Sequence, residues 1–123
     1  MLRIFWTASQ TWSHNQEVLP EFVTQQQPLI YSNNLPEDYL VLLLDCDSSY
    51  VHWIVVNGYS VLPYQSPNPS DKEIHRYTFY LFSIPPRFYL SKSIDRSGFN
   101  LEKFIRRIPH AHLLSTTTFI TGK

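Results

Sequence analysis

The sequence has little of several residue types, and each shortage excludes a class of protein. A single cysteine, Cys46, among 123 residues excludes an intramolecular disulfide framework and a zinc site with several cysteine ligands. Three glycines are too few for a P-loop or a dinucleotide-binding glycine pattern. Ten Lys and Arg residues balance ten Asp and Glu residues. The chain therefore lacks the cationic excess of sequence-independent nucleic-acid binders, and we expect no direct nucleic-acid partner.

Long hydrophobic runs are also missing. The longest, Tyr39–Leu44, falls far short of the roughly eighteen apolar residues that a membrane-spanning helix needs. The first sixteen residues are too polar and too broken in their hydrophobicity for a signal peptide. We therefore expect a cytoplasmic protein with no transmembrane segment.

The residues that are plentiful indicate a β-rich domain. Hydrophobic residues make up 43% and aromatic residues 15%, and there are nine prolines. That composition can form a buried core, and aromatic side chains suit the half-buried surface of a sheet. At this length we expect a single domain spanning residues 1–123.

Sequence patterns place the individual elements. Strands are expected over residues 2–6, 28–32, 39–45, 51–57, 75–84 and 113–120, with a proline-rich loop over residues 63–71. Segment 39–45 is apolar on both faces, which predicts a central strand. One helix is expected near the C-terminus, where Leu101, Phe104, Ile105 and Ile108 form one apolar stripe. Asn100 is its expected N-cap and Pro109 its stop. The fold class is thus mainly β, mostly antiparallel, with one C-terminal helix.

Two short segments concentrate the reactive side chains. Asp45 and Asp47 follow an apolar strand at positions i and i+2, so on an extended chain both point to the same side. A two-residue turn at Ser48–Ser49 would place Asp45 opposite His52, although Ser-Ser fits such turns poorly. A carboxylate in that position would orient the imidazole and favour its protonated form, which attracts anions.

In the second segment, His75 and Tyr77 should share one face, while Arg76 points the other way and pairs with a carboxylate. An imidazole beside a phenol offers hydrogen-bond donors to a small oxyanion. Taken singly, such a histidine or aspartate is more often structural. Cys46 alone is most simply a small buried hydrophobe.

Together, the order of these segments resembles the phosphatidylethanolamine-binding protein family. The matching stretches are Leu42–Asp47, His52–Asn57, Tyr64–Pro69 and Ile74–Phe82. Phe99 to Phe104 is also similar to the FN-x-x-x-F helix start of that family. The resemblance extends over roughly residues 28 to 119, and the ordered D-x-D, HW and HRY motifs make it specific.

The resemblance implies an antiparallel β-sandwich built on a large central sheet, with a small anion pocket. By position, the family's pocket residues correspond to Asp45, Asp47, His52, His75 and Tyr77, and its rim loop to Pro67 and Pro69. Family members bind phospholipid head groups or phosphorylated ligands, and they regulate kinases, proteases or transcription complexes. The implied function is therefore a non-enzymatic regulatory binding protein. It would have an anionic ligand or phospholipid head group, a protein partner and no cofactor.

Departures from the family pattern keep two alternatives open. Cys46 stands in place of the usual proline between the aspartates, and the connections at residues 48–51 and 57–63 are short. Shorter loops would fit an interaction protein that has kept the sandwich but lost ligand binding. A more distant alternative is a small hydrolase that uses an Asp–His pair or a metal bound by Asp and His side chains. The pair His110 and His112 could also seed a metal site.

Overall fold

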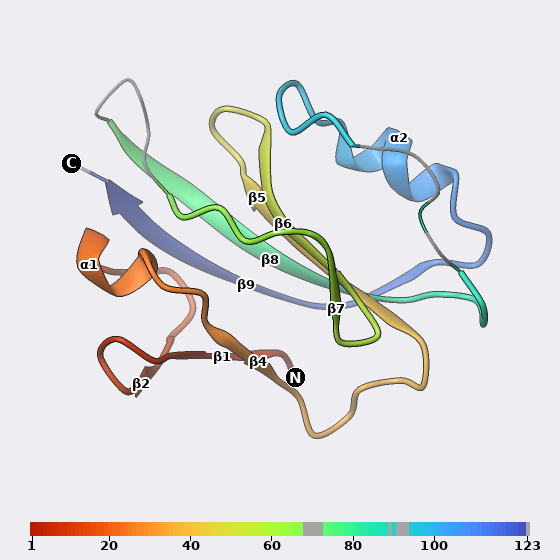
Figure 1. Ribbon diagram of the computed structural model, residues 1–123, viewed down its shortest axis with the longest axis horizontal. Helices are drawn as coiled ribbons and strands as arrows, with labels where there is room; N and C mark the ends of the chain where they lie inside the picture. Colours follow the sequence, from red (N-terminus) through yellow and green to blue (C-terminus); the bar gives the residue numbers. More distant parts are fainter. Residues whose placement is uncertain (68–72, 89, 91–93, 123) are drawn as a thin grey trace.

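The computed structural model describes residues 1–67, 73–88, 90 and 94–122, which form two β-sheets and two short helices (Figure 1). The elements are β1 (Arg3–Trp6), β2 (Thr11–Trp12), β3 (Glu17–Val18), α1 (Glu21–Thr24), β4 (Leu29–Tyr31), β5 (Tyr39–Asp45), β6 (Tyr50–Val56), β7 (Tyr59–Leu62), β8 (Ile74–Ser83), α2 (Leu101–Arg106) and β9 (His112–Gly122).

The larger sheet has six strands in the order β3-β9-β8-β5-β6-β7, and the smaller has the order β2-β1-β4. β5 lies inside the larger sheet between β8 and β6, and residues 40–45 are buried. The central strand expected from its two apolar faces is thus confirmed. All pairings are antiparallel except that of β3 with β9, so the larger sheet is mixed.

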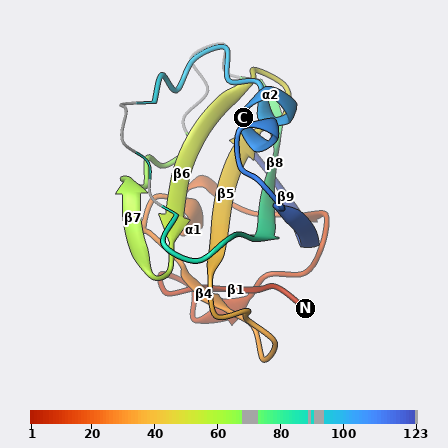
Figure 2. The same ribbon diagram turned by 90° about the vertical axis from the view of Figure 1, so that its right-hand side faces the viewer.

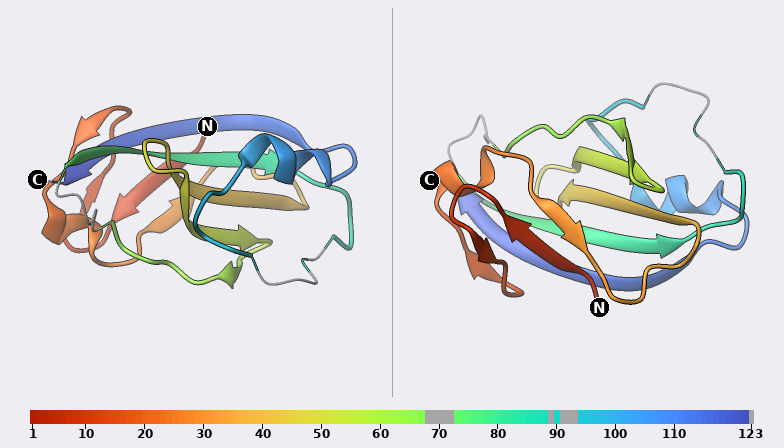
Figure 3. Two further views of the ribbon diagram at one scale, coloured as in Figure 1. Left: turned by 90° about the horizontal axis from the view of Figure 1, so that it is seen from above. Right: turned by 60° about the horizontal axis from the view of Figure 1, so that its bottom comes forward.

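The smaller sheet covers one face of the larger sheet and α2 covers the other (Figures 1, 2 and 3). Alternation along β5 separates two cores, because successive side chains of a strand point to opposite faces. Val41 and Leu43 pack with Ile4 and Trp6 of β1. Leu40, Leu42 and Leu44 pack with Ile108 and with the partly buried side chains of α2. The domain is therefore a β-sandwich of unequal sheets with a helix on its outer side.

α2 begins as the sequence predicts. The side chain of Asn100 accepts a hydrogen bond from the Lys103 backbone amide at 2.9 Å, which caps the first turn. Arg106 forms an exposed ion pair with Glu102 one turn earlier. The helix ends at Arg106, and Ile108 beyond it is buried in the core.

Several short elements had not been expected. α1 is a single helical turn that follows Pro20, and β7 follows β6 through a two-residue turn at Asn57 and Gly58. Both turn residues have positive φ, 49° and 86°, as a tight hairpin with the twist of a sheet requires.

The chain segment before α1 lies along β9. Beyond the β3 pairing, the Leu19 amide donates to the Ile120 carbonyl at 2.8 Å, and the Thr121 hydroxyl donates to the Leu19 carbonyl at 2.6 Å. Segments about 100 residues apart in sequence are therefore joined at this edge of the sheet. Neither helix of the described chain has the length and apolar character that crossing a membrane requires.

Candidate functional site

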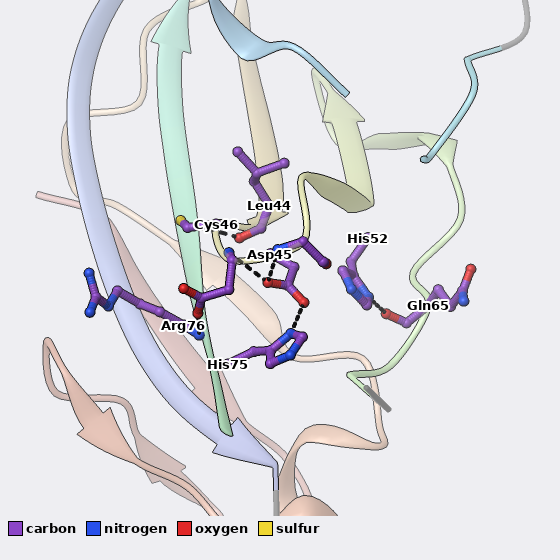
Figure 4. Close-up of polar contacts among 9 residues, drawn as sticks. Leu44, Asp45, Cys46, His52, Gln65, His75 and Arg76 are labelled. Atoms are coloured by element: carbon purple, nitrogen blue, oxygen red, sulfur yellow. Dashed lines mark hydrogen bonds and ion pairs between the residues drawn. The ribbon is translucent and has the colours of Figure 1, made fainter. Parts of the chain in front are cut away.

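Asp45 and His75 form a buried pair at one end of the larger sheet (Figure 4). Asp45 ends β5, and His75 lies near the start of the neighbouring strand β8. The His75 Nδ1 and Asp45 Oδ2 atoms are 2.5 Å apart, and the two residues are only 6% and 3% exposed. The other carboxylate oxygen of Asp45 accepts from the backbone amides of Asp47 and Ser48 at 2.9 and 3.1 Å. These bonds fix the orientation of the carboxylate and, through it, that of the imidazole.

The expected pairing of Asp45 with His52 is wrong. Asp45 lies opposite Tyr50, which leaves a four-residue turn instead of the two-residue turn at Ser48–Ser49. Ser49 occupies the left-handed region in that turn, with φ of 55°. The strand register, not the carboxylate itself, thus determines which histidine Asp45 meets.

A β-bulge directs His52 toward the same site. Leu43 pairs with Trp53 and Leu44 pairs with Val51, so His52 is the extra residue in β6. Regular alternation would send His52 and Trp53 to opposite faces, but a bulge redirects a side chain. Trp53 packs in the core beneath the smaller sheet, and the His52 ring lies edge-on to Tyr77 of that core, 5.3 Å between centroids.

His52 is held in one tautomer. Its Nδ1 lies 2.6 Å from the Gln65 carbonyl, and since a carbonyl only accepts, Nδ1 must carry the proton. Burial lowers the pKa of His52 below its ordinary value of 6.5. The Gln65 bond and Asp45 act in the opposite direction, while the charges of Arg96 and His75 add to the lowering. The neutral ring therefore keeps Nε2 as an acceptor, and protonation turns it into a donor.

Tyr77 completes the group of side chains. Its ring stacks on His75 with centroids 6.3 Å apart, and on Phe119 with centroids 5.1 Å apart. The imidazole and phenol that the HRY motif was expected to bring to one face are thus together and buried. We refer to Asp45, His52, His75 and Tyr77 as the histidine cluster.

No family model and no curated protein match the sequence. The structure is similar to that of a carboxypeptidase Y inhibitor in complex with its cognate proteinase, with a TM-score of 0.78 and 15% identity over 99% of this chain and 82% of that chain. It is also similar to a phosphatidylethanolamine-binding protein from Plasmodium falciparum, with a TM-score of 0.70 and 16% identity over 98% of this chain and 83% of that chain. The chain has the phosphatidylethanolamine-binding protein fold. The fold implied by the order of the motifs is thus confirmed.

Within the phosphatidylethanolamine-binding protein fold, Asp47 lies apart from the histidine cluster. The chain turns after Asp45, so the expectation that both carboxylates point to one side is wrong. Asp47 is exposed, and its Oδ2 accepts from the Arg76 backbone amide at 2.7 Å, while the Cys46 amide donates to the Arg76 carbonyl at 2.9 Å. Asp47 therefore extends the pairing of β5 with β8. Its carboxylate binds the backbone amide of Arg76, whereas the expected partner of a carboxylate was the Arg76 side chain.

Cys46 and the two prolines complete the set of predicted residues. Cys46 is exposed instead of buried, and its Sγ lies 3.2 Å from the Thr78 hydroxyl. Pro67 is buried after the loop that carries Gln65. Pro69 lies outside the described residues.

Three residues near the site had not been expected. The Tyr50 hydroxyl donates to the Gln65 side chain at 3.0 Å, and the Gln65 amide donates to the His52 carbonyl at 2.9 Å. The Arg96 guanidinium also donates to the His52 carbonyl, at 2.9 Å. The two bonds to the His52 carbonyl use a backbone group that every residue carries, so no sequence motif marks them.

The described residues contain no group of three or more His, Cys, Asp or Glu side chains suited to hold a metal ion. The exposed pair His110 and His112 thus gains no third ligand among them.

Proposed function

We propose that this chain is a binding protein of the phosphatidylethanolamine-binding type. Its ligand is a small anion, such as the phosphate of a phospholipid head group or of a phosphorylated ligand, held at the histidine cluster. Acting without catalysis, it regulates a protein partner such as a kinase or another signalling protein. The observation that carries the proposal is that His52 and Tyr77 lie beside the buried Asp45–His75 pair.

We expect the cluster to accept an anion despite the presence of a carboxylate. Asp45 accepts three hydrogen bonds, from His75 and from two backbone amides. Its role is therefore to orient His75, whose Nε2 lies on the side of the ring away from Asp45. Protonated imidazoles donate strong, charge-assisted hydrogen bonds to oxyanions. An anion beside His52 would also offset the burial that lowers the pKa of that ring.

The test is a titration with inorganic phosphate and, separately, short-chain phosphoethanolamine, followed by NMR of the histidine ring signals. We expect the signals of His52 and His75 to move, while that of the exposed His110 serves as an internal control. His75→Ala should abolish the response of His52, whereas His110→Ala should leave it unchanged. If neither His52 nor His75 responds to either compound, the chain does not bind anions at this cluster.

A second candidate is an interaction protein without ligand binding. The observation that favours it is the small exposure of the two histidine residues, 5% for His52 and 6% for His75. Carboxypeptidase Y is a direct probe, because the similar inhibitor forms a complex with its cognate proteinase. Binding of this enzyme that persists in His75→Ala, together with no response to phosphate, would favour the second candidate. Binding lost in His75→Ala, with the fold retained, would count against it.

A further inference from the structure

Arg96 joins two segments that lie on either side of His52. Its Nη1 donates to the carbonyls of His52 and Val51 at 2.9 and 3.3 Å, and its Nη2 donates to the Pro63 carbonyl at 2.7 Å. Its own backbone carbonyl accepts from the Val51 amide at 3.0 Å. One residue therefore binds both the beginning of β6 and the loop that follows β7.

These contacts lie on the edge of β6 away from β5, where β7 no longer pairs with it. The pairing of β7 with β6 stops at Ile54, so β7 does not reach the bulge at His52. Arg96 takes the place of a neighbouring strand along Val51 and His52, and the Phe99 amide continues the contact by donating to the Ser49 carbonyl at 2.8 Å. A bulge that interrupts its own ladder needs such bonds to keep its shape.

The same guanidinium also holds the loop that binds the His52 ring. Pro63 lies two residues before Gln65, whose carbonyl accepts from His52 Nδ1 and whose amide donates to the His52 carbonyl. Both the backbone of His52 and the acceptor of its ring are thus tied to one side chain. A guanidinium can do this because it presents five donors in a rigid plane, whereas an ammonium cannot span three carbonyls in this way.

We propose that Arg96 is a positioning residue of the anion site, which holds the β6 bulge and the Pro63–Gln65 loop together and so directs the His52 ring without touching the ligand. The proposal deepens the function proposed above and rests on it for the ligand. The orientation of His52 can nevertheless be measured with no ligand present.

The guanidinium charge has a second, separable effect. The charged and titratable groups around His52 are Asp45, His75, Arg96 and the rings of Tyr50 and Tyr77. Burial is the largest cause of the lowered pKa of His52, and the positive charge of Arg96 lowers this pKa further. Removing the positive charge should therefore raise the pKa of His52, whereas a lysine in its place should preserve most of this effect.

The experiment compares Arg96→Met and Arg96→Lys with Arg106→Met, a matched control at an exposed arginine of α2. Without ligand, NMR should show the His52 ring signals displaced in both Arg96 variants, and the pKa of His52 raised only in Arg96→Met. Affinity for inorganic phosphate should fall by about tenfold in both, by analogy with residues that orient metal-binding histidines, whose loss costs tenfold or more. Arg106→Met should match the wild type in every measurement.

Two results would overturn the proposal. One is a His52 ring signal in Arg96→Met that coincides with the wild type. The other is full rescue of that signal and of phosphate affinity by Arg96→Lys, which would show that charge alone is sufficient. Arg96→Lys also decides the matter if Arg96→Met does not fold. If wild-type protein does not bind phosphate, the proposed function fails, while the ligand-free signal of His52 still tests the role of Arg96.

Discussion

Replacing Asp45 by alanine removes the acceptor of three hydrogen bonds at once. The His75 Nδ1 atom would lose its partner at 2.5 Å in a place where both residues are almost fully buried. The amides of Asp47 and Ser48 would lose theirs as well, but they lie in an exposed turn where water can replace the carboxylate.

The expected loss of stability follows from this difference in burial. A hydrogen bond to a charged group contributes about 1.5–3 kcal/mol, and a donor left buried without a partner costs a similar amount. The two turn amides should add less than about 1 kcal/mol together, because they remain hydrated. We expect Asp45→Ala to lower the free energy of unfolding by about 3 kcal/mol. Asp45→Asn keeps the acceptor for the turn, so its smaller loss measures the His75 bond separately.

The matched control is the other aspartate of the D-x-D motif. Asp47→Ala removes one bond, to the Arg76 amide at 2.7 Å, at an exposed position, and should cost about 1 kcal/mol or less. Urea unfolding followed by tryptophan fluorescence suits the comparison, because Trp6 and Trp53 are buried. Equal losses in the two alanine variants, or an Asp45→Ala variant as stable as the wild type, would refute this account of the site.

Three further predictions concern other residues. Because burial lowers the pKa of His52 below 6.5 in the folded state, the unfolded chain takes up a proton that the folded chain does not. This contribution to stability is complete above the ordinary pKa and is lost as pH falls below it. In His52→Asn, the free energy of unfolding in urea should therefore depend less on pH between pH ~8 and ~5 than in the wild type. Asn100→Ala removes the cap bond to Lys103 and should cost about 1 kcal/mol in the same assay, while Asn100→Ser should cost much less. The exposed Cys46 thiol should react with a chromogenic thiol reagent in the folded protein, and protection until unfolding would contradict its placement.

The long strands could be predicted because burial leaves a clear signal in their composition. Residues 39–45, and much of residues 75–84, are apolar on both faces, and the structure places β5 and β8 within one residue of those limits. The helix that begins at Leu101 could likewise be predicted, from its apolar stripe and its asparagine cap. The Asn57–Gly58 pair is also typical of a tight hairpin turn. It could have predicted the hairpin of β6 with β7, which the strand patterns alone do not indicate.

The partner of Asp45 could not be predicted in the same way. It depends on the number of residues in the turn and on the bulge at His52, and neither follows from hydrophobic alternation. Ser-Ser has no strong turn preference, and the left-handed conformation at Ser49 is uncommon for serine. The resemblance to a family therefore predicts which residues form the cluster, whereas only the structure shows that Asp45 pairs with His75 and not with His52.

The position of β9 has a consequence for how the protein is made. β9 lies between β3 and β8, so the segment at residues 17–19 acquires its partner only when residues 112–122 have been synthesised. Until then β8 presents an unpaired edge, and Tyr77 lacks the Phe119 ring on which it stacks. Contacts of such large sequence separation fold slowly and leave the nascent chain open to association through that edge. We therefore expect the sheet to assemble only after β9 has been translated.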